Sequence, residues 1–168
     1  MSAQAAFRTK ILFDTNQLLQ RAKSEEEILS QTASQLMKLL NRSLIVYPEQ
    51  NGDLGSEQVF EIDREVPCNI FSAPEERDAA NWTFANKKRS GAGTDSYPDA
   101  KGLYLALRTG GGVFGVIGID LSEKPLDAFE NSVLLSILGE GALAIENRRN
   151  ALEKEQAALQ ARNEELRA

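Results

Sequence analysis

The sequence predicts an α+β domain in which helices flank a central antiparallel sheet and a long helix ends the chain. Two observations predict this class. Segments with the periodicity of amphipathic helices open and close the chain, and short apolar runs joined in pairs by turn residues lie between them. Strands joined by such tight turns run antiparallel, which excludes a doubly wound parallel sheet. The 168 residues suffice for one domain with a buried core.

Two helices are expected at the N-terminal end. Apolar residues recur at three- and four-residue spacings over residues 7–22, which is typical of a helix with one buried face. Ser24 followed three residues later by Glu27 matches a capping box. A second helix is therefore expected to begin there and to end near Asn41.

A first hairpin and a third helix are expected next. The apolar run 44–47 stops at Pro48, residues 50–53 have turn chemistry, and residues 59–62 alternate like a half-buried strand. Ser72, three residues before Glu75, is expected to cap the third helix. Its buried face is expected to hold Ala79, Trp82 and either Phe84 or Ala85.

The last two strands and the last helix have the clearest patterns. Residues 103–108 and 113–120 are apolar runs separated by a glycine-rich turn, which predicts a hairpin. From residue 126 onward only Gly139 and Gly141 interrupt a helical pattern that continues to the end of the chain.

The composition excludes several classes of function. A net charge of −6 argues against nucleic-acid binding, which needs clustered excess Lys and Arg. The absence of histidine removes the commonest metal ligand, the usual general base and the usual phosphoaccepting imidazole. Cys68 stands alone, so it can form no internal disulfide, and a half-buried loop position is expected for it. We therefore expect no catalytic residue, no metal and no cofactor.

No membrane-spanning segment is expected. The most apolar run, residues 113–121, has about half of the ~20 residues that a spanning helix requires. The N-terminus lacks the charged and then apolar order of a signal peptide. We therefore expect the segment itself to be soluble.

Five strings of residues carry a resemblance to a known family. They are Asp14–Leu19, Leu40–Ser43, Trp82–Asn86, Ala92–Leu105 and Gly112–Gly118. With this order of elements, the sequence resembles a GAF domain, a small-molecule-sensing relative of the PAS fold. More specifically, it resembles the GAF domain of Kdp-type (KdpD) potassium sensor histidine kinases. The most specific part is the Trp-x-Phe-x-Asn string with the Gly-Thr-Asp-x-x-Pro loop that follows it, and the resemblance covers most of residues 7–118.

The resemblance implies a regulatory segment of a membrane-bound sensor kinase in a two-component system. In that family the domain lies between a transmembrane bundle and the kinase module, on the cytoplasmic side of the inner membrane. The absence of histidine and of an ATP-lid motif implies that this segment does not itself phosphorylate. One alternative is a sensor domain with its own small-molecule pocket. A remote alternative is an enzyme of unknown type.

A small-molecule pocket, if present, is expected against the face that carries Phe114, Val116 and Gly118, closed by the loop 92–102. The irregular stretch 87–102 contains this loop, and loops longer than ~12 residues in compact domains are commonly functional or disordered. The candidate ligand residues are Trp82, Phe84, Asn86, Thr94, Asp95, Tyr97, Tyr104, Arg108 and Gly118. The competing interpretation is that Trp82 and Phe84 pack the third helix onto the sheet, and that residues 87–89 are a solvated run of charges.

The last helix carries the strongest functional signal. Leu138, Ile145, Leu152, Leu159 and Leu166 recur every seven residues, as in the seam of a coiled coil. The second set of seam positions is poor, since it holds Ala142, Arg149, Gln156 and Asn163. A weak parallel homodimer that could shift register is therefore expected, with a solvated helical tail as the alternative. We expect residues 7–145 to form the GAF-like domain and residues 146–168 to form a helical signalling linker.

Overall fold

The computed structural model describes residues 2–67 and 69–167, so the prediction for Cys68 lies outside the described residues. Its elements, in chain order, are α1 (Ala3–Arg21), α2 (Glu25–Leu40), β1 (Leu44–Gln50), β2 (Asp53–Leu54), β3 (Gln58–Phe60), the short 3₁₀ helix η1 (Ile70–Ser72), α3 (Pro74–Asn86), β4 (Ser90–Gly91), β5 (Gly102–Thr109), β6 (Gly112–Asp120) and α4 (Ala128–Arg167).

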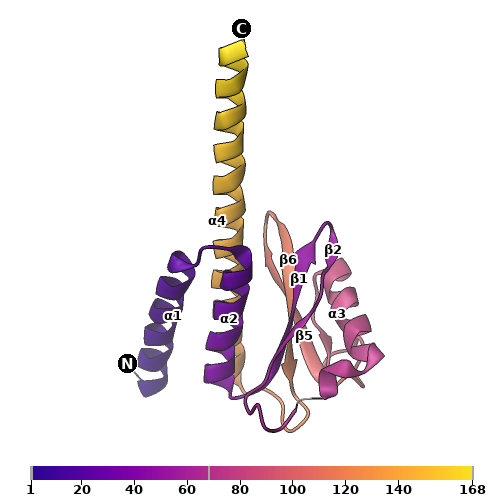
Figure 1. The fold of residues 1–168 in the computed structure, drawn as a ribbon. Helices are drawn as coiled ribbons and strands as arrows, with labels where there is room; N and C mark the ends of the chain where they lie inside the picture. Colours follow the sequence, from indigo (N-terminus) through magenta and orange to yellow (C-terminus); the bar gives the residue numbers. More distant parts are fainter. Residues whose placement is uncertain (1, 68, 168) are drawn as a thin grey trace.

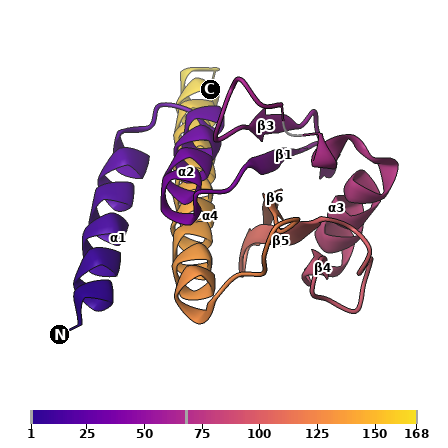
Figure 2. The ribbon, with the colours of Figure 1, turned by 90° about the horizontal axis from the view of Figure 1, so that it is seen from below.

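The strands form one antiparallel sheet, as the sequence predicts. Their order is β2-β1-β6-β5-β4, and β3 also pairs with β1. Helices α2 and α4 cover one face of the sheet, α1 packs on their outer side, and α3 covers the opposite face (Figures 1 and 2). The two faces therefore bury separate cores.

The core under α2 and α4 is the larger of the two. It combines the apolar stripes of these helices with alternate residues of β1, β5 and β6. Helices α2 and α4 approach closely at Gly141, where an added Cβ atom would lie 2.7 Å from the hydroxyl oxygen of Thr32. Only glycine at this position therefore allows the two helices their present separation.

The beginning and end of α2 follow the sequence signals. Ser24 accepts a hydrogen bond from the Glu27 amide, and the Glu27 carboxylate accepts one from the Lys23 amide. Asn41 ends the helix in the left-handed conformation, with φ of 52°.

Two local predictions need correction. Strand β1 does not stop at Pro48, which lies within the strand opposite Gly115; the reversal comes at Asn51 and Gly52, whose positive φ values suit a two-residue hairpin turn. Helix α3 is not capped by Ser72, whose hydroxyl donates to the Asn69 carbonyl instead. The helix begins at Pro74, because proline fits the first helical position without losing a hydrogen bond.

A β-bulge changes the face on which one predicted residue lies. The register of β5 and β6 shifts between Leu107 and Arg108. Beyond this shift the alternation of side chains along β6 is interrupted, and Phe114 packs in the core under α2 and α4. The prediction that Phe114 shares a face with Val116 and Gly118 is therefore wrong.

Helix α4 belongs to the domain over its first half and leaves it over its second (Figure 1). Its buried residues end at Ile145, and all positions from 151 to 167 are exposed. In length and composition α4 also satisfies the requirements of a membrane-crossing helix, although polar residues divide its apolar stretches into short runs. The core helix of a globular domain meets the same requirements, and the apolar residues in the first half of α4 do line a core.

Candidate functional site

The face of the sheet under α3 is a small, closely packed core. Tyr47, Tyr104 and Val116 are fully buried there. A Cβ atom on Gly118 would come within 2.4 Å of a ring carbon of Tyr104. The Tyr104 ring therefore fills the space directly beside Gly118.

A buried carboxylate organises this core. Glu76 of α3 is 1% exposed and accepts hydrogen bonds from the amides of Lys101 and Gly102, each at 3.0 Å. Its Oε1 atom also accepts a hydrogen bond of 2.7 Å from the Tyr104 hydroxyl. Three donors thus satisfy the carboxylate without a cation and tie α3 to the beginning of β5.

The two buried tyrosines are held in their protonated form. Burial raises the pKa of the Tyr104 phenol above its usual range, and the hydrogen bond to Glu76 adds to the effect. Burial also raises the pKa of Tyr47 to about 12. Tyr104 therefore remains a donor to Glu76 at neutral pH.

The structure brings together only some of the predicted ligand residues. Tyr104 and Gly118 meet in the core under α3, with Phe84 packed against its border. Of the others, Trp82 is half-buried on α3, Thr94 is half-buried in the loop, and Asn86, Asp95, Tyr97 and Arg108 are exposed. The Thr94 hydroxyl lies 2.8 Å from the carbonyl oxygens of Gly91 and Ser96, so it stabilises the loop itself.

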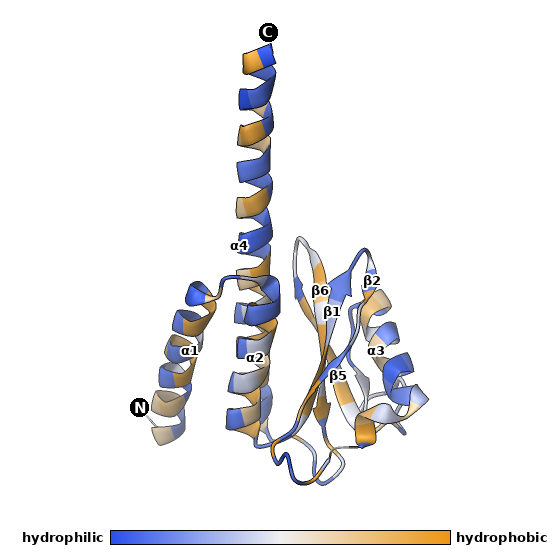
Figure 3. Ribbon diagram, in the orientation of Figure 1, coloured by the Kyte–Doolittle hydropathy of each residue, from blue (hydrophilic) through white to orange (hydrophobic). Residues whose placement is uncertain are grey.

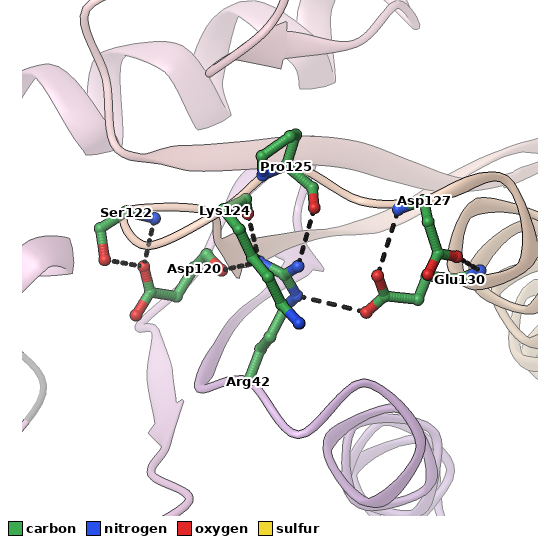
Figure 4. Close-up of polar contacts among 7 residues, drawn as sticks. All are labelled: Arg42, Asp120, Ser122, Lys124, Pro125, Asp127 and Glu130. Atoms are coloured by element: carbon green, nitrogen blue, oxygen red, sulfur yellow. Dashed lines mark hydrogen bonds and ion pairs between the residues drawn. The ribbon is translucent and has the colours of Figure 1, made fainter.

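The start of α4 is joined to α2 by a buried arginine. Arg42 is 6% exposed and donates to three carbonyl groups of the segment before α4, those of Asp120, Lys124 and Pro125 (Figure 4). Its Nε atom lies 3.5 Å from a carboxylate oxygen of Glu130 in the first turn of α4.

The first turn of α4 is itself capped, and the cap includes the partner of Arg42. Glu130 exchanges hydrogen bonds with Asp127, since each side chain accepts from the amide of the other. Arg42 therefore links the end of α2 to the connection that positions the long helix (Figure 4).

A second arginine holds α4 where it leaves the domain. Arg149 makes a bidentate contact with Glu25 of α2, at 2.5 and 3.1 Å, and lies 3.3 Å from a carboxylate oxygen of Glu49 in β1. Its guanidinium also lies 5.0 Å from the centre of the Phe114 ring. Hydrogen bonding to Glu25 raises the pKa of Arg149, so its guanidinium stays positively charged throughout the physiological pH range.

The Arg149 contact divides the predicted leucine column into a buried part and an exposed part. Leu138 and Ile145 are buried in the domain core, with exposed fractions of 4% and 0%. Leu152, Leu159 and Leu166 are exposed by 43%, 55% and 78%. Because seven residues fall only about 20° short of two helical turns, the exposed leucines continue the side of α4 that packs against α2 and the sheet in the domain. Figure 3 shows the exposed part of α4 as mostly hydrophilic, with separate apolar bands along it.

No family model matches this chain. It is 30% identical to sensor protein KdpD of Clostridium acetobutylicum over 162 residues, which is 96% of this chain and 18% of the length of that relative. The GAF domain of the potassium sensor histidine kinase KdpD from Escherichia coli superposes with a TM-score of 0.63 at 21% identity, covering 90% of this chain and 99% of that domain. The chain is a GAF domain related to KdpD.

The GAF fold also appears in a more distant structure. The GAF domain of a putative sensor histidine kinase from Pseudomonas syringae pv. tomato superposes with a TM-score of 0.60 at 19% identity, covering 92% of this chain and 94% of that one. The predicted α+β class and the predicted family resemblance are both confirmed.

Sequence reasoning missed the three polar residues that organise this GAF domain. Glu76 precedes Ala79, Ala80 and Thr83 at helical spacings, so this pattern could have predicted that it lies on the buried face of α3. The heptad pattern marks Arg149 only as a poor seam residue and does not indicate its contact with Glu25. The carbonyl partners of Arg42 lie about eighty residues along the chain, and no local pattern indicates them.

No group of three or more His, Cys, Asp or Glu side chains suited to a metal ion occurs within residues 2–67 and 69–167.

Proposed function

We propose that this GAF domain is a regulatory segment of a membrane-bound sensor histidine kinase, and that α4 relays a conformational change from it to a kinase module. The similarity to the sensor protein KdpD, which in Escherichia coli is a potassium sensor histidine kinase, supports this class of parent protein, a two-component sensor. In such a parent the domain would lie on the cytoplasmic side of the inner membrane. Since the sequence contains no histidine, phosphorylation of histidine would belong to another segment.

The observation that carries the proposal is the continuity of α4. One uninterrupted helix of 40 residues begins at the Arg42 contact, lines the core, passes the Arg149 contact and extends beyond the domain. A helix is stiff over this length, so a rotation or shift at its buried end is transmitted to its free end. The GAF core and the free end of the helix are thus mechanically connected.

The same proposal includes a parallel homodimer. The exposed leucines Leu152, Leu159 and Leu166 supply one half of a coiled-coil seam. Closer to the domain, α2 occupies that side of α4, so the seam between two copies would begin after Arg149 and the helices would diverge below it. Two such linkers leaving in one direction would suit a dimeric kinase.

A chimeric kinase tests the relay. The matching segment of the Clostridium KdpD would be replaced by this chain, and residues would be deleted from the exposed part of α4. Deletion of residues 153–159 removes seven residues and returns the leucines to within about 20° of their phase, so regulated autophosphorylation is expected to persist. Deletion of residues 153–157 turns the seam by about 140° relative to the domain, so autophosphorylation is expected to become locked on or off. Equal regulation in both deletions would contradict a helical relay.

The second candidate function is a small-molecule sensor, with the predicted ligand residues around the loop 92–102. What favours it is the pair of polar groups under α3, because a ligand with a hydroxyl or an anionic group could compete for the Tyr104–Glu76 hydrogen bond or for the Lys101 and Gly102 amides. Native mass spectrometry of the purified chain, before and after refolding, tests it. A bound mass lost on refolding would favour the sensor, and its absence would favour the relay alone.

A further inference from the structure

A groove on the outer edge of the sheet has an unusual charge for this protein. It lies between the segment that follows α3, the outer edge of β5 and the first half of α4. Its lining comprises the cations Lys87, Lys88, Arg89 and Arg108 and the apolar residues Leu105, Ala106, Leu135, Leu138 and Gly139. No acidic side chain contributes to it, although the chain as a whole carries a net charge of −6.

The four cations are not used by the domain itself as ion pairs. Within the described residues the ion pairs involve Arg42, Arg77 and Arg149. Arg89 is oriented by a hydrogen bond of 2.9 Å to the side-chain oxygen of Asn131 in α4. The groove therefore presents positive charge that nothing on its own walls neutralises.

The floor of the groove includes an open edge of the sheet. Strand β4 pairs only two residues with β5, joining Ser90 to Tyr104 and Gly91 to Leu103. Among the described residues, no strand pairs with the remainder of β5, residues 105–109, on the side away from β6. This edge offers unpaired backbone amides and carbonyls, which are the groups that a further strand would use.

We propose that this groove binds an extended acidic peptide segment of a partner, which adds to β5 as an edge strand. The backbone of the segment would pair with residues 105–109, and its carboxylates would meet Lys87, Lys88, Arg89 and Arg108. An apolar side chain of the segment would cover Leu135, which is 48% exposed beside the edge. Charge complementarity selects an acidic occupant, and the unpaired edge selects an extended one.

A labelled peptide tests the proposal with the intact chain. The probe is a fluorescein-labelled octapeptide made of four Glu-Val repeats, and its binding is measured by fluorescence anisotropy at low salt. Saturable binding is expected, with resonance shifts in the backbone amides of residues 105–109. Arg108→Glu and Lys88→Glu are each expected to weaken binding at least tenfold. Lys154→Glu makes the same change of charge on the exposed part of α4 and is expected to leave binding unchanged.

Two further probes separate an edge strand from simple attraction of anions. A peptide of the same sequence with alternate amides N-methylated cannot pair with the edge and is expected to lose at least tenfold in affinity. Equal binding of this peptide would overturn the proposal. The absence of saturable binding would also overturn the proposal. The cations would then serve only to prevent aggregation at the exposed edge. Binding to phosphatidylserine vesicles without binding to the peptide would overturn it in favour of a lipid surface.

Discussion

The two halves of α4 share one helix and one heptad column but meet different surroundings. In the first half, Leu138 and Ile145 are buried in the domain core, whereas Leu159 and Leu166 in the second half are more than half exposed. The change occurs within about one turn, at Arg149. The same spacing of leucines thus builds a core on one side of this residue and offers an association surface on the other.

A heptad column therefore does not by itself define a dimer seam. Inside the domain α2 and the sheet already occupy the apolar side of α4, and Gly141 allows α2 to approach closely. Only the residues beyond the Arg149 contact remain available to a second copy. The substitutions below test this division.

The largest effect on the free energy of unfolding is expected for substitutions in the buried half of α4. Ile145→Ala is expected to lower the free energy of unfolding by about 2–5 kcal/mol, because it removes fully buried methyl groups and leaves a cavity. Leu159→Ala, its matched control in the exposed half, is expected to change it by less than about 0.5 kcal/mol at concentrations where the chain is monomeric. Urea unfolding followed by the fluorescence of Trp82, the single tryptophan, measures both. Similar losses in the two variants would show that the second half also packs on the domain.

Arg42→Met is expected to have the next effect, a loss of about 2–4 kcal/mol. The substitution removes the buried guanidinium, so three carbonyl groups lose their donor and Glu130 loses its ion pair. Arg162→Met, on the exposed part of α4, is the control and is expected to be neutral. The same urea experiment measures both variants. An unchanged Arg42→Met variant would show that the start of α4 is held by its own cap alone.

Arg149→Met is expected to cost about 1 kcal/mol, because its guanidinium is partly exposed and its ion pairs are screened by solvent. A sharper readout is hydrogen exchange, in which the amides of residues 146–152 should exchange faster while those of residues 133–142 stay protected. Arg148→Met is the neighbouring control and is expected to leave both segments unchanged. Faster exchange along the whole of α4 would contradict a local contact.

The double variant Leu152→Asp and Leu159→Asp is expected to have the smallest effect on stability. The same variant is expected to have the largest effect on association. It places charges on the exposed side of the helix, so the fold is expected to persist within about 0.5 kcal/mol while the dimer fraction falls. Light scattering at a fixed concentration measures the dimer. The paired control is Ala157→Asp and Ala161→Asp on another side of the same segment. A dimer that survives the leucine variant would place the interface on the globular part.

Several elements could be predicted because their causes are local. The Ser24 cap, the end of α2 at Asn41 and the hairpin of β5 and β6 each depend on residues within a few positions of one another. The uninterrupted length of α4 likewise follows from a helical pattern without proline. These features gave the fold class, and the family strings were sufficient for the GAF resemblance.

Local patterns also failed where two signals competed. Ser72 has the capping spacing, but its hydroxyl donates to the Asn69 carbonyl instead, and the helix begins at Pro74. Pro48 was interpreted as the end of a strand, but pairing with β6 carries β1 past it. In both cases a tertiary or neighbouring contact outweighed a propensity of about 1 kcal/mol.

The candidate sites depended on contacts that cross the chain. The bulge at Leu107 and Arg108 moves Phe114 to the other face, and strict alternation gives no sign of it. Glu76, Arg42 and Arg149 acquire their roles from partners 25 to 124 residues away. Helix type, caps and turns follow from short-range sterics and hydrogen bonding, which the sequence alone specifies. The tertiary structure decides which side of a helix is covered and which charged side chain forms an ion pair or hydrogen bond. Both depend on elements that are distant in sequence and become neighbours only in the folded chain.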